Sequence, residues 1–543
     1  MNNNRLFFLL IALSASILTR TRIVFCIDYS TKMARAEKMI ARAAAFFKKT
    51  TRNKACRDFT YSDHWQDGSL TVFVDDIAGT RLVSRNYPAT IPETDLNLKN
   101  LFDEPAFPLM LEAARKEHGG WVPLFFLNSL VYTYVKAVKK EKRTYILGTC
   151  IFCDYEPELI CRLLLKAVDR YVQRKKSISD AFDIINNAYG PCIYGSIYAM
   201  IIDMNGKCRA NGGNTLLINQ NLLAAKSHDA PVIRKIIDFV KKNNGGTGFI
   251  EVRIGTYVKK IYFKKIINPR TQEVLIALAG YSPTVDKNTV YERIEKIKKL
   301  FADYDREDAL AVINNIKRSV SMPSKSSNTL IGDDLNCMIL DRDYIVRAYD
   351  KKQDYALVGR NYLTYVDQKG MPFTQSLKSV IDAKGAGWVT RYAHNTLERL
   401  YTEKIETESG PVIAVIFGYY PYDRREIGEI LTDDAYHYLK THASPATFGI
   451  FVQTDSPFIK GDMHIHTYDS KGFCWTAGLT KTKIWSQDTT WPKAAEGWVD
   501  DRRTKNVLKR FKKNIGRIIP GIGEEFMIGT TYFDDRSFDR QTN

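Results

Sequence analysis

The feature that most constrains the fold is a pattern that recurs four times along the chain. In each copy an apolar strand runs into an aspartate, and a turn residue follows three positions later. The four pairs are Asp76 and Gly79, Asp203 and Gly206, Asp341 and Tyr344, and Asp469 and Gly472. Glycine supplies the positive φ that a tight hairpin turn requires, and aspartate caps the turn. A repeat of this size predicts several similar domains rather than one large core.

A glycine–aromatic step follows in each copy and opens a second strand. The aromatic residues are Trp121, Phe249, Trp388 and Trp498, at 42, 43, 44 and 26 residues from the turn position. Three copies therefore agree closely, and the last has lost a segment the size of a helix. A final apolar strand closes each unit, at 145–152, 274–281, 412–419 and 526–533.

An amphipathic helix precedes each unit, with apolar residues three and four positions apart at 39–47, 163–171, 294–301 and 430–439. The expected fold class is α+β, with each domain a long N-terminal helix plus an antiparallel sheet that carries a helical insertion. The predicted domains are 31–156, 157–288, 289–426 and a shortened 427–543, and the Ser-rich segment 319–328 is predicted to be a linker.

Residues 1–28 are typical of a secretory signal peptide. Arg5 precedes an apolar run from Leu6 to Leu13, and small residues follow at Ser14 to Ser16. The run is shorter than the roughly 20 residues that cross a bilayer. We therefore expect a periplasmic or secreted protein that does not span the membrane after cleavage, and no later segment has transmembrane length.

Charge and cysteine content leave some alternatives open. The net charge of +18 is spread over many Lys-Lys pairs, so solvated surface charge competes with affinity for an anionic partner. The nine cysteines form no regular framework. Cys150 and Cys153 have no second pair at zinc-site spacing, so buried thiols are expected, with one or two disulfides if the chain is exported.

The first copy contains Val-Phe-Val-Asp-Asp-x-x-Gly at 72–79, Gly-Gly-Trp-Val at 119–122, Tyr-Val-Lys at 134–136 and Ile-Leu-Gly-Thr-x-Ile-Phe at 146–152. This order resembles the single Cache domain, an extracytoplasmic sensor fold that is PAS-like in shape. Nearly all of the mature chain resembles four degenerate tandem copies of it. The resemblance implies binding of a small metabolite, such as a short carboxylate or an amino acid. Cache receptors continue into a membrane span and a cytoplasmic output, and we expect neither of these in this protein. A separate protein partner for signalling is therefore expected.

The resemblance also places a ligand between the sheet and the loop and helix that precede the glycine–aromatic strand. The implied contacts are Trp121, Phe125, Tyr132, Tyr134 and Lys136 in the first copy, and Trp388, Arg391, Tyr392 and Tyr401 in the third. Aromatic walls exclude water, and a single cation then binds a carboxylate strongly. Arg391 would grip the carboxylate with two parallel hydrogen bonds. The alternative is that aromatic residues at alternate strand positions are plain core.

Catalytic motifs are absent from the sequence: there is no nucleophile elbow, no phosphate-binding loop, and no spacing of acids or histidines typical of an enzyme. His464 and His466 share a predicted strand face, and they are interpreted as core residues rather than metal ligands. We expect no cofactor and no metal. The predicted function is an exported, non-catalytic protein that binds or senses a small molecule. The alternative is a basic extracytoplasmic scaffold with vestigial pockets that binds anionic polymer, lipid or protein, and nucleic acid is not the expected partner.

Overall fold

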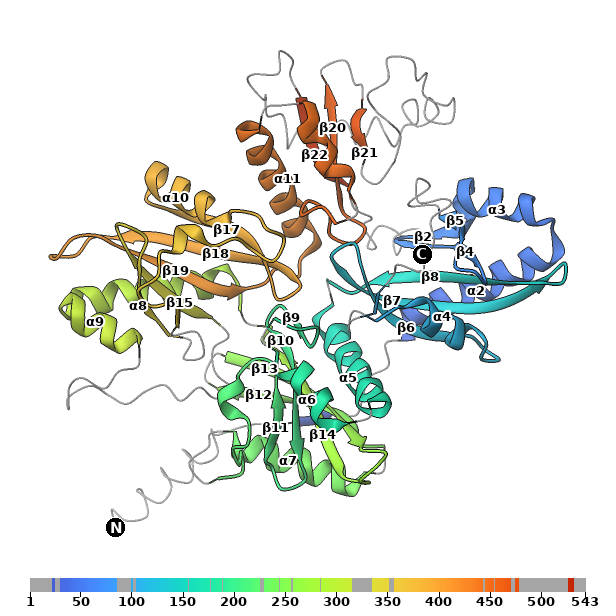
Figure 1. Cartoon of the computed structure of the whole chain (residues 1–543), viewed down its shortest axis with the longest axis horizontal. Helices are drawn as coiled ribbons and strands as arrows, with labels where there is room; N and C mark the ends of the chain where they lie inside the picture. The colour runs from blue at the N-terminus through green and yellow to red at the C-terminus, as the bar shows by residue number, and fades with distance from the viewer. Residues whose placement is uncertain are drawn as a thin grey trace, which may run out of the picture. The chain divides into compact units, whose positions relative to one another are not determined.

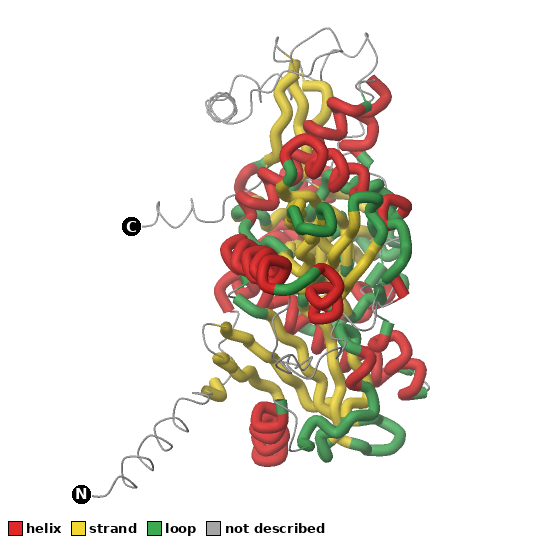
Figure 2. The backbone as a smooth tube through the Cα atoms, turned by 90° about the vertical axis from the view of Figure 1, so that its left-hand side faces the viewer, coloured by secondary structure: helices red, strands yellow, loops and turns green. Residues whose placement is uncertain are grey.

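The computed structural model divides into two compact units, residues 1–28 with 157–421, and residues 29–156 with 422–543. The structure describes residues 22–24, 30–84, 99–100, 104–314, 335–350, 356–469, 474–477 and 526–531, apart from 155, 176, 188, 225–228, 244, 255–256, 284, 443–444 and 454. Within this part of the chain, helices lie beside antiparallel sheets (Figure 1, Figure 2).

The second unit contains what we call the first and the fourth sheet. The first sheet has the order β5-β4-β8-β7-β6. Its strands are β4 (Phe73–Asp76), β5 (Arg81–Ser84), β6 (Gly120–Phe126), β7 (Ser129–Lys140) and β8 (Arg143–Phe152), accompanied by α2 (Ser30–Lys49), α3 (Arg52–Tyr61), η1 (Asp63–Trp65), β2 (Gln66–Asp67), β3 (Leu70–Thr71) and α4 (Phe107–Ala114). The fourth sheet, with the order β21-β20-β22, comprises β20 (His464–Asp469), β21 (Cys474–Ala477) and β22 (Phe526–Thr531), with α11 (Arg424–Thr441) and η7 (Pro445–Val452).

The first unit contains the second and the third sheet. The second sheet follows β1-β12-β13-β14-β10-β11. It is built from β1 (Arg22–Val24), β9 (Ile193–Tyr194), β10 (Ile197–Asp203), β11 (Cys208–Asn211), β12 (Thr247–Ile254), β13 (Tyr257–Ile267) and β14 (Val274–Tyr281), with α5 (Pro157–Arg174), α6 (Ile178–Asn186), η4 (Thr215–Leu217) and α7 (Ala230–Lys242). The third sheet follows β16-β15-β19-β18-β17. It is built from β15 (Asn336–Asp341), β16 (Val346–Tyr349), β17 (Ala386–Ala393), β18 (Thr396–Ile405) and β19 (Val412–Tyr419), with α8 (Lys287–Asp303), α9 (Arg306–Ile313), η6 (Tyr362–Thr364) and α10 (Phe373–Lys384).

The first three sheets share one strand order. If the strands of each are numbered along the chain, leaving aside β1 and the short β9, the order is 2-1-5-4-3 with every pair antiparallel. A helix lies in the insertion between strands 2 and 3 of each: α4, α7 and α10. The α+β fold class with a helical insertion is therefore confirmed. The division into four domains stays a prediction. The helix α11 begins at Arg424, shortly before the predicted start of the last domain.

The aspartate turns explain why strands 1 and 2 form a hairpin. In three copies the aspartate is Asp76, Asp203 or Asp341, and its Oδ1 accepts hydrogen bonds of 2.9–3.0 Å from the amides two and four positions later. The turn residue has a φ of 85° at Gly79, 77° at Gly206 and 60° at Tyr344. The third copy therefore keeps the left-handed turn without glycine. The turn residue predicted at Gly472 lies outside the described residues.

Each of the first three sheets buries two faces. In the third sheet, Ile294 and Ile297 of α8 pack with Ile339 on one face. On the other face, Leu377 and Ile381 of α10 pack with other residues of the same strands. The long preceding helix and the insertion helix thus cover opposite faces, because successive strand residues point to opposite sides.

Other expectations meet the structure only in part. The candidate signal residues Arg5 to Ser16 lie outside the described residues. Where the structure describes the chain, no helix is long and apolar enough to cross a membrane. Cys153, Cys161, Cys192, Cys208 and Cys337 are buried and are not joined in disulfides. Burial raises the pKa of the Cys161 and Cys192 thiols well above the ordinary value, as expected for structural thiols.

Candidate binding sites

The five candidate residues of the first sheet share one face, and it is the face covered by α2. Trp121 pairs with Tyr134, and Tyr132 pairs with the residue two positions after Trp121. Phe125 and Lys136 continue the same alternation along β6 and β7. Trp121 Nε1 donates a 2.7 Å hydrogen bond to Oε1 of Glu37 on α2. The structure therefore brings these residues together, but away from the insertion helix α4.

The aromatic rings of this group pack against one another. Trp121 stacks on Tyr132 with ring centroids 4.6 Å apart, and it lies 5.1 Å from Tyr134. The Tyr134 hydroxyl donates to the carbonyl of His118, and burial raises its pKa. Tyr132 and Tyr134 are buried, Phe125 and Lys136 half-buried. The stacked rings hold the Trp121 indole in place on the sheet, and its hydrogen bond to Glu37 joins the sheet to α2.

The opposite face of the first sheet is apolar where a ligand was expected. Val122 and Leu124 of β6 pack with Phe107 and Met110 of α4 and with Val135 of β7. All five side chains are buried. Such a cluster provides no polar group that would orient a small metabolite.

Two candidates of the third sheet repeat the arrangement of the first. Trp388 Nε1 donates a 2.9 Å hydrogen bond to the hydroxyl of Tyr291 on α8, and its ring lies 5.2 Å from Tyr401. Tyr392 is buried, and its amide donates to Asp367 Oδ2 at 2.8 Å. Trp388 and Tyr401 thus contribute to the core on the α8 face.

Arg391 is the exception among the candidates, because it lies on the α10 face. Its guanidinium lies 5.4 Å from the ring centre of Phe373 on α10 and 4.7 Å from that of Phe417. Its Nε donates to Glu398 Oε2 at 2.6 Å, and its Nη1 lies 3.4 Å from the hydroxyl of Tyr362. The Arg391 side chain keeps 20% of its surface exposed, whereas Glu398 keeps 2%.

Electrostatics keep this buried pair ionised. Burial acts to raise the pKa of Glu398, but the charge of Arg391, the charge of His394 and the 2.7 Å hydrogen bond from the Gly418 amide together hold it below the usual value. Burial raises the pKa of Tyr362 to about 12, so its hydroxyl stays protonated. The arginine has five N–H donors, and the contacts named above use only part of them.

Sequence reasoning missed Glu398 and Tyr362. The available signal was the acidic residue Glu398 near the start of the strand Thr396–Ile405. Glu398 lies directly opposite Arg391 across the hairpin, and an acid opposite an arginine is a pairing that the sequence could have suggested.

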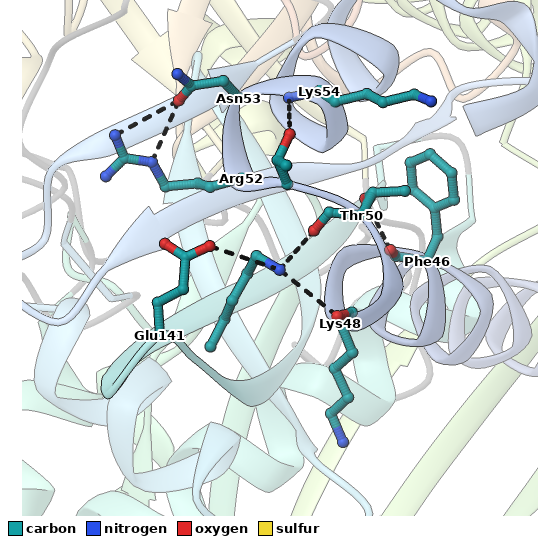
Figure 3. Close-up of polar contacts among 9 residues, drawn as sticks. Phe46, Lys48, Thr50, Arg52, Asn53, Lys54 and Glu141 are labelled. Carbon is teal, nitrogen blue, oxygen red and sulfur yellow. Dashed lines mark hydrogen bonds and ion pairs between the residues drawn. The ribbon is translucent and has the colours of Figure 1, made fainter.

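A second candidate site is an open hollow of about 600 Å³ beside the start of α3. It is lined by Thr51, Arg52, Asn53, Glu141, Arg143 and Tyr145. Figure 3 shows how the start of α3 faces the turn that carries Glu141. The hydrogen bond to Tyr145 raises the pKa of Arg52, and Arg143 is exposed. The two arginines give the hollow a positive charge that Glu141 offsets only in part.

Lys140 contributes less to that charge than its position suggests. Its Nζ lies 3.5 Å from the carbonyl of Lys48 and bonds the carbonyl of Thr50, at the end of α2. It also lies 3.9 Å from Glu141. A cation at the C-terminal carbonyls of a helix stabilises the helix.

Metal binding has no support in the described residues, where no group of three or more His, Cys, Asp or Glu side chains could hold an ion. His464 is largely buried, and burial lowers its pKa to about 4, so the ring is neutral near pH 7.

Comparisons with known proteins identify sensory domains of chemoreceptors among similar structures. No family model matches the chain, and no curated protein matches it. A methyl-accepting chemotaxis protein from Vibrio parahaemolyticus is 15% identical and covers 23% of this chain and 90% of its own, with a TM-score of 0.19. The ligand-binding domain of Pseudomonas fluorescens chemoreceptor CtaA, in complex with L-serine, is 13% identical. The match covers 48% of this chain and 91% of that domain, with a TM-score of 0.21. The sensory domain of Campylobacter jejuni chemoreceptor Tlp3 is 14% identical. The match covers 46% of this chain and 86% of that domain, with a TM-score of 0.20. Because these TM-scores are low, the fold class rests on the strand order described above.

Proposed function

We propose that the chain is an exported, non-catalytic binding protein of four degenerate Cache-type domains that binds a small carboxylate at Arg391. Signalling would then pass through a separate protein partner. The single observation that carries the proposal is the position of Arg391 on the α10 face, close to two aromatic rings and with 20% of its side-chain surface exposed. The shared strand order of three sheets supports the repeat of one domain type.

The chemistry of this position suits a carboxylate or a zwitterionic amino acid. A guanidinium recognises a carboxylate through parallel N–H bonds, and low surrounding polarity strengthens them. Glu398 would attract an ammonium group close to that carboxylate, and Phe373 and Phe417 would contact an apolar side chain. A charged pair, with its arginine close to two aromatic rings, distinguishes this position from the apolar α4 face of the first sheet.

The test is a thermal-shift screen of the full chain against short carboxylates and amino acids, followed by variants. A ligand that binds only the folded state raises Tm. Arg391→Lys keeps the charge beside Glu398 but loses the planar fork, so we expect the ligand-induced rise to disappear. The control is Arg347→Lys, which alters an arginine that pairs with Asp341 at the surface of the same sheet. An unchanged rise in Arg391→Lys would refute the proposal.

A second candidate function is favoured by the basic hollow at Arg52 and Arg143. In this alternative the chain is an extracytoplasmic interaction protein whose surface binds an anionic polymer. The hollow is open, and a polyanion would contact both arginines and the nearby exposed Lys54. Binding of this kind weakens steeply as salt rises, because exposed charges are screened.

Inorganic polyphosphate is the probe for this alternative. The double variant Arg52→Ala/Arg143→Ala should bind it less tightly at low salt than Arg270→Ala/Lys241→Ala, which removes two exposed charges from the β13–β14 connection and from α7. Equal affinity of the two double variants would show that the hollow is not the site.

A further inference from the structure

Two hairpin turns, one in each unit, combine a left-handed backbone with an asparagine in the second position. The β7–β8 turn, Glu141 and Lys142, has the same backbone with φ of 49° and 63° but carries no asparagine. The β6–β7 turn is formed by Leu127 and Asn128, with φ of 53° and 56°. The β17–β18 turn is formed by His394 and Asn395, with φ of 50° and 62°. A two-residue turn with both φ values positive matches the twist of the strands, and asparagine is among the residues that tolerate it.

In the second unit the first of these turns contacts the segment that precedes β20. Asn128 Nδ2 donates to the carbonyls of Ser456 and Ile459, at 2.7 and 3.0 Å. The Gly461 amide donates to the carbonyl of Leu127 at 2.9 Å. Asn128 is buried, and Ile459 joins the apolar cluster of the first sheet. Three hydrogen bonds therefore join residues more than 300 positions apart.

In the first unit the second turn makes the same three bonds to the segment that precedes β10. Asn395 Nδ2 donates to the carbonyls of Gly190 and Ile193, at 3.2 and 3.0 Å. The Gly195 amide donates to the carbonyl of His394 at 2.9 Å. In both units the accepting carbonyls belong to residues five and two positions before the glycine.

The two segments also share a sequence. Residues 190–195 read Gly-Pro-Cys-Ile-Tyr-Gly, and residues 456–461 read Ser-Pro-Phe-Ile-Lys-Gly, so both contain Pro-x-Ile-x-Gly. Both final glycines have a φ of 61°. A Cβ would lie 3.0 Å from the Tyr420 ring at Gly195 and 2.8 Å from the Phe152 ring at Gly461. Glycine is required in both places by the backbone and by the close approach of an aromatic ring.

We infer that these contacts are one docking interface used twice, in which an x-Asn turn recognises a Pro-x-Ile-x-Gly segment. The occupant of each turn is a segment of this same chain. In the first unit the interface joins the second sheet to the third, and in the second unit it joins the fourth sheet to the first. All three hydrogen bonds go to backbone groups, so the two x positions are free to differ.

Both x positions differ, and the second one gives each interface its own chemistry. It is Tyr194 in the first unit and Lys460 in the second, and both are buried. Lys460 Nζ donates to the carbonyl of Asn128 at 2.6 Å and lies 3.0 Å from Asp154 Oδ1. A buried lysine needs a carboxylate close to it. The segment that carries Lys460 therefore fits the turn beside Asp154, and it does not fit a site without an acid.

Hydrogen exchange of the full chain tests the inference with three single variants. Asn128→Gly and Asn395→Gly each remove the amide but allow the left-handed turn. Asn219→Gly is the control, because Asn219 also has a positive φ of 68° but belongs to neither interface. We expect Asn128→Gly to speed exchange of residues 456–463 by about tenfold or more and to leave 190–197 unchanged, since each lost hydrogen bond leaves a carbonyl unsatisfied. Asn395→Gly should speed exchange of residues 190–197 and leave 456–463 unchanged. Asn219→Gly should change neither segment.

Two results would overturn the inference. The first is exchange of residues 456–463 in Asn128→Gly that equals the control. The second is loss of protection in α3 and β8 as well, because Asn128 would then support its whole unit rather than this contact. Circular dichroism of each variant verifies that the secondary structure is intact before exchange is compared.

Discussion

Replacing Lys460 by methionine should destabilise the second unit strongly near neutral pH. Lys460 and Asp154 are both 1% exposed, and their charged atoms lie 3.0 Å apart. The variant leaves the Asp154 carboxylate buried without its main cation. Removing one partner of a buried ion pair costs about 3–5 kcal/mol, because the remaining charge stays desolvated. Arg424 and Asp462 also act on Asp154, with opposite signs.

The loss should depend on pH. Burial raises the pKa of Asp154 to about 6, although the charge and hydrogen bond of Lys460 lower it. The folded pKa is above that of the unfolded chain, roughly 3.9, so the folded state binds more protons between these values. This group therefore makes the wild type less stable as pH rises through that window. Methionine raises the pKa of Asp154 further, so the cost is full at pH 8 and smaller at pH 5.

Urea unfolding followed by hydrogen exchange of β7 and β8 measures this effect in the second unit alone. The companion variant Lys460→Met/Asp154→Leu removes both charges, and it should recover most of the stability, because apolar replacements of a buried pair are often neutral. Equal destabilisation of Lys460→Met at pH 5 and pH 8 would refute the reasoning. A double variant as unstable as Lys460→Met would also refute it.

Three further outcomes are expected. Gly206→Ala should cost about 1–3 kcal/mol in urea unfolding, since a Cβ would lie 2.5 Å from Cγ of Leu223 at a φ of 77°; no loss would contradict the turn geometry. Trp121→Phe should cost about 1 kcal/mol by the same assay, because the indole N–H bond to Glu37 is lost and the ring stays; an effect on ligand-induced Tm shifts instead would return Trp121 to a binding role. Cys161 should resist a thiol reagent at pH 8 until the chain unfolds, because burial raises its pKa; fast labelling of the folded chain would contradict its burial.

Much of the fold could be predicted from the sequence because local chemistry specifies it. Aspartate with a left-handed residue three positions later defines a hairpin, and the structure confirms this at Asp76, Asp203 and Asp341. The order of strands could not be predicted, since it depends on which apolar strands pair at long range. The 2-1-5-4-3 order places the last strand beside the first, far along the chain.

The candidate site was harder to predict for a physical reason. Alternation along a strand shows which residues share a face, and Trp121 and Tyr134 do share one. Alternation does not show which helix covers that face, because α2 and α4 both offer apolar residues. Arg391 lies on the α10 face, where its charge pairs with Glu398.

The contact between Asn128 and residues 456–461 affects how the N-terminal part of the chain folds during synthesis. The first sheet leaves the ribosome about 300 residues before the segment that completes its apolar cluster, which at roughly 5–20 residues per second is a delay of about 15–60 s. During that interval the surface that Ile459 later covers is exposed on a nascent chain. A C-terminal truncation that removes this segment would prolong that exposure for the lifetime of the protein.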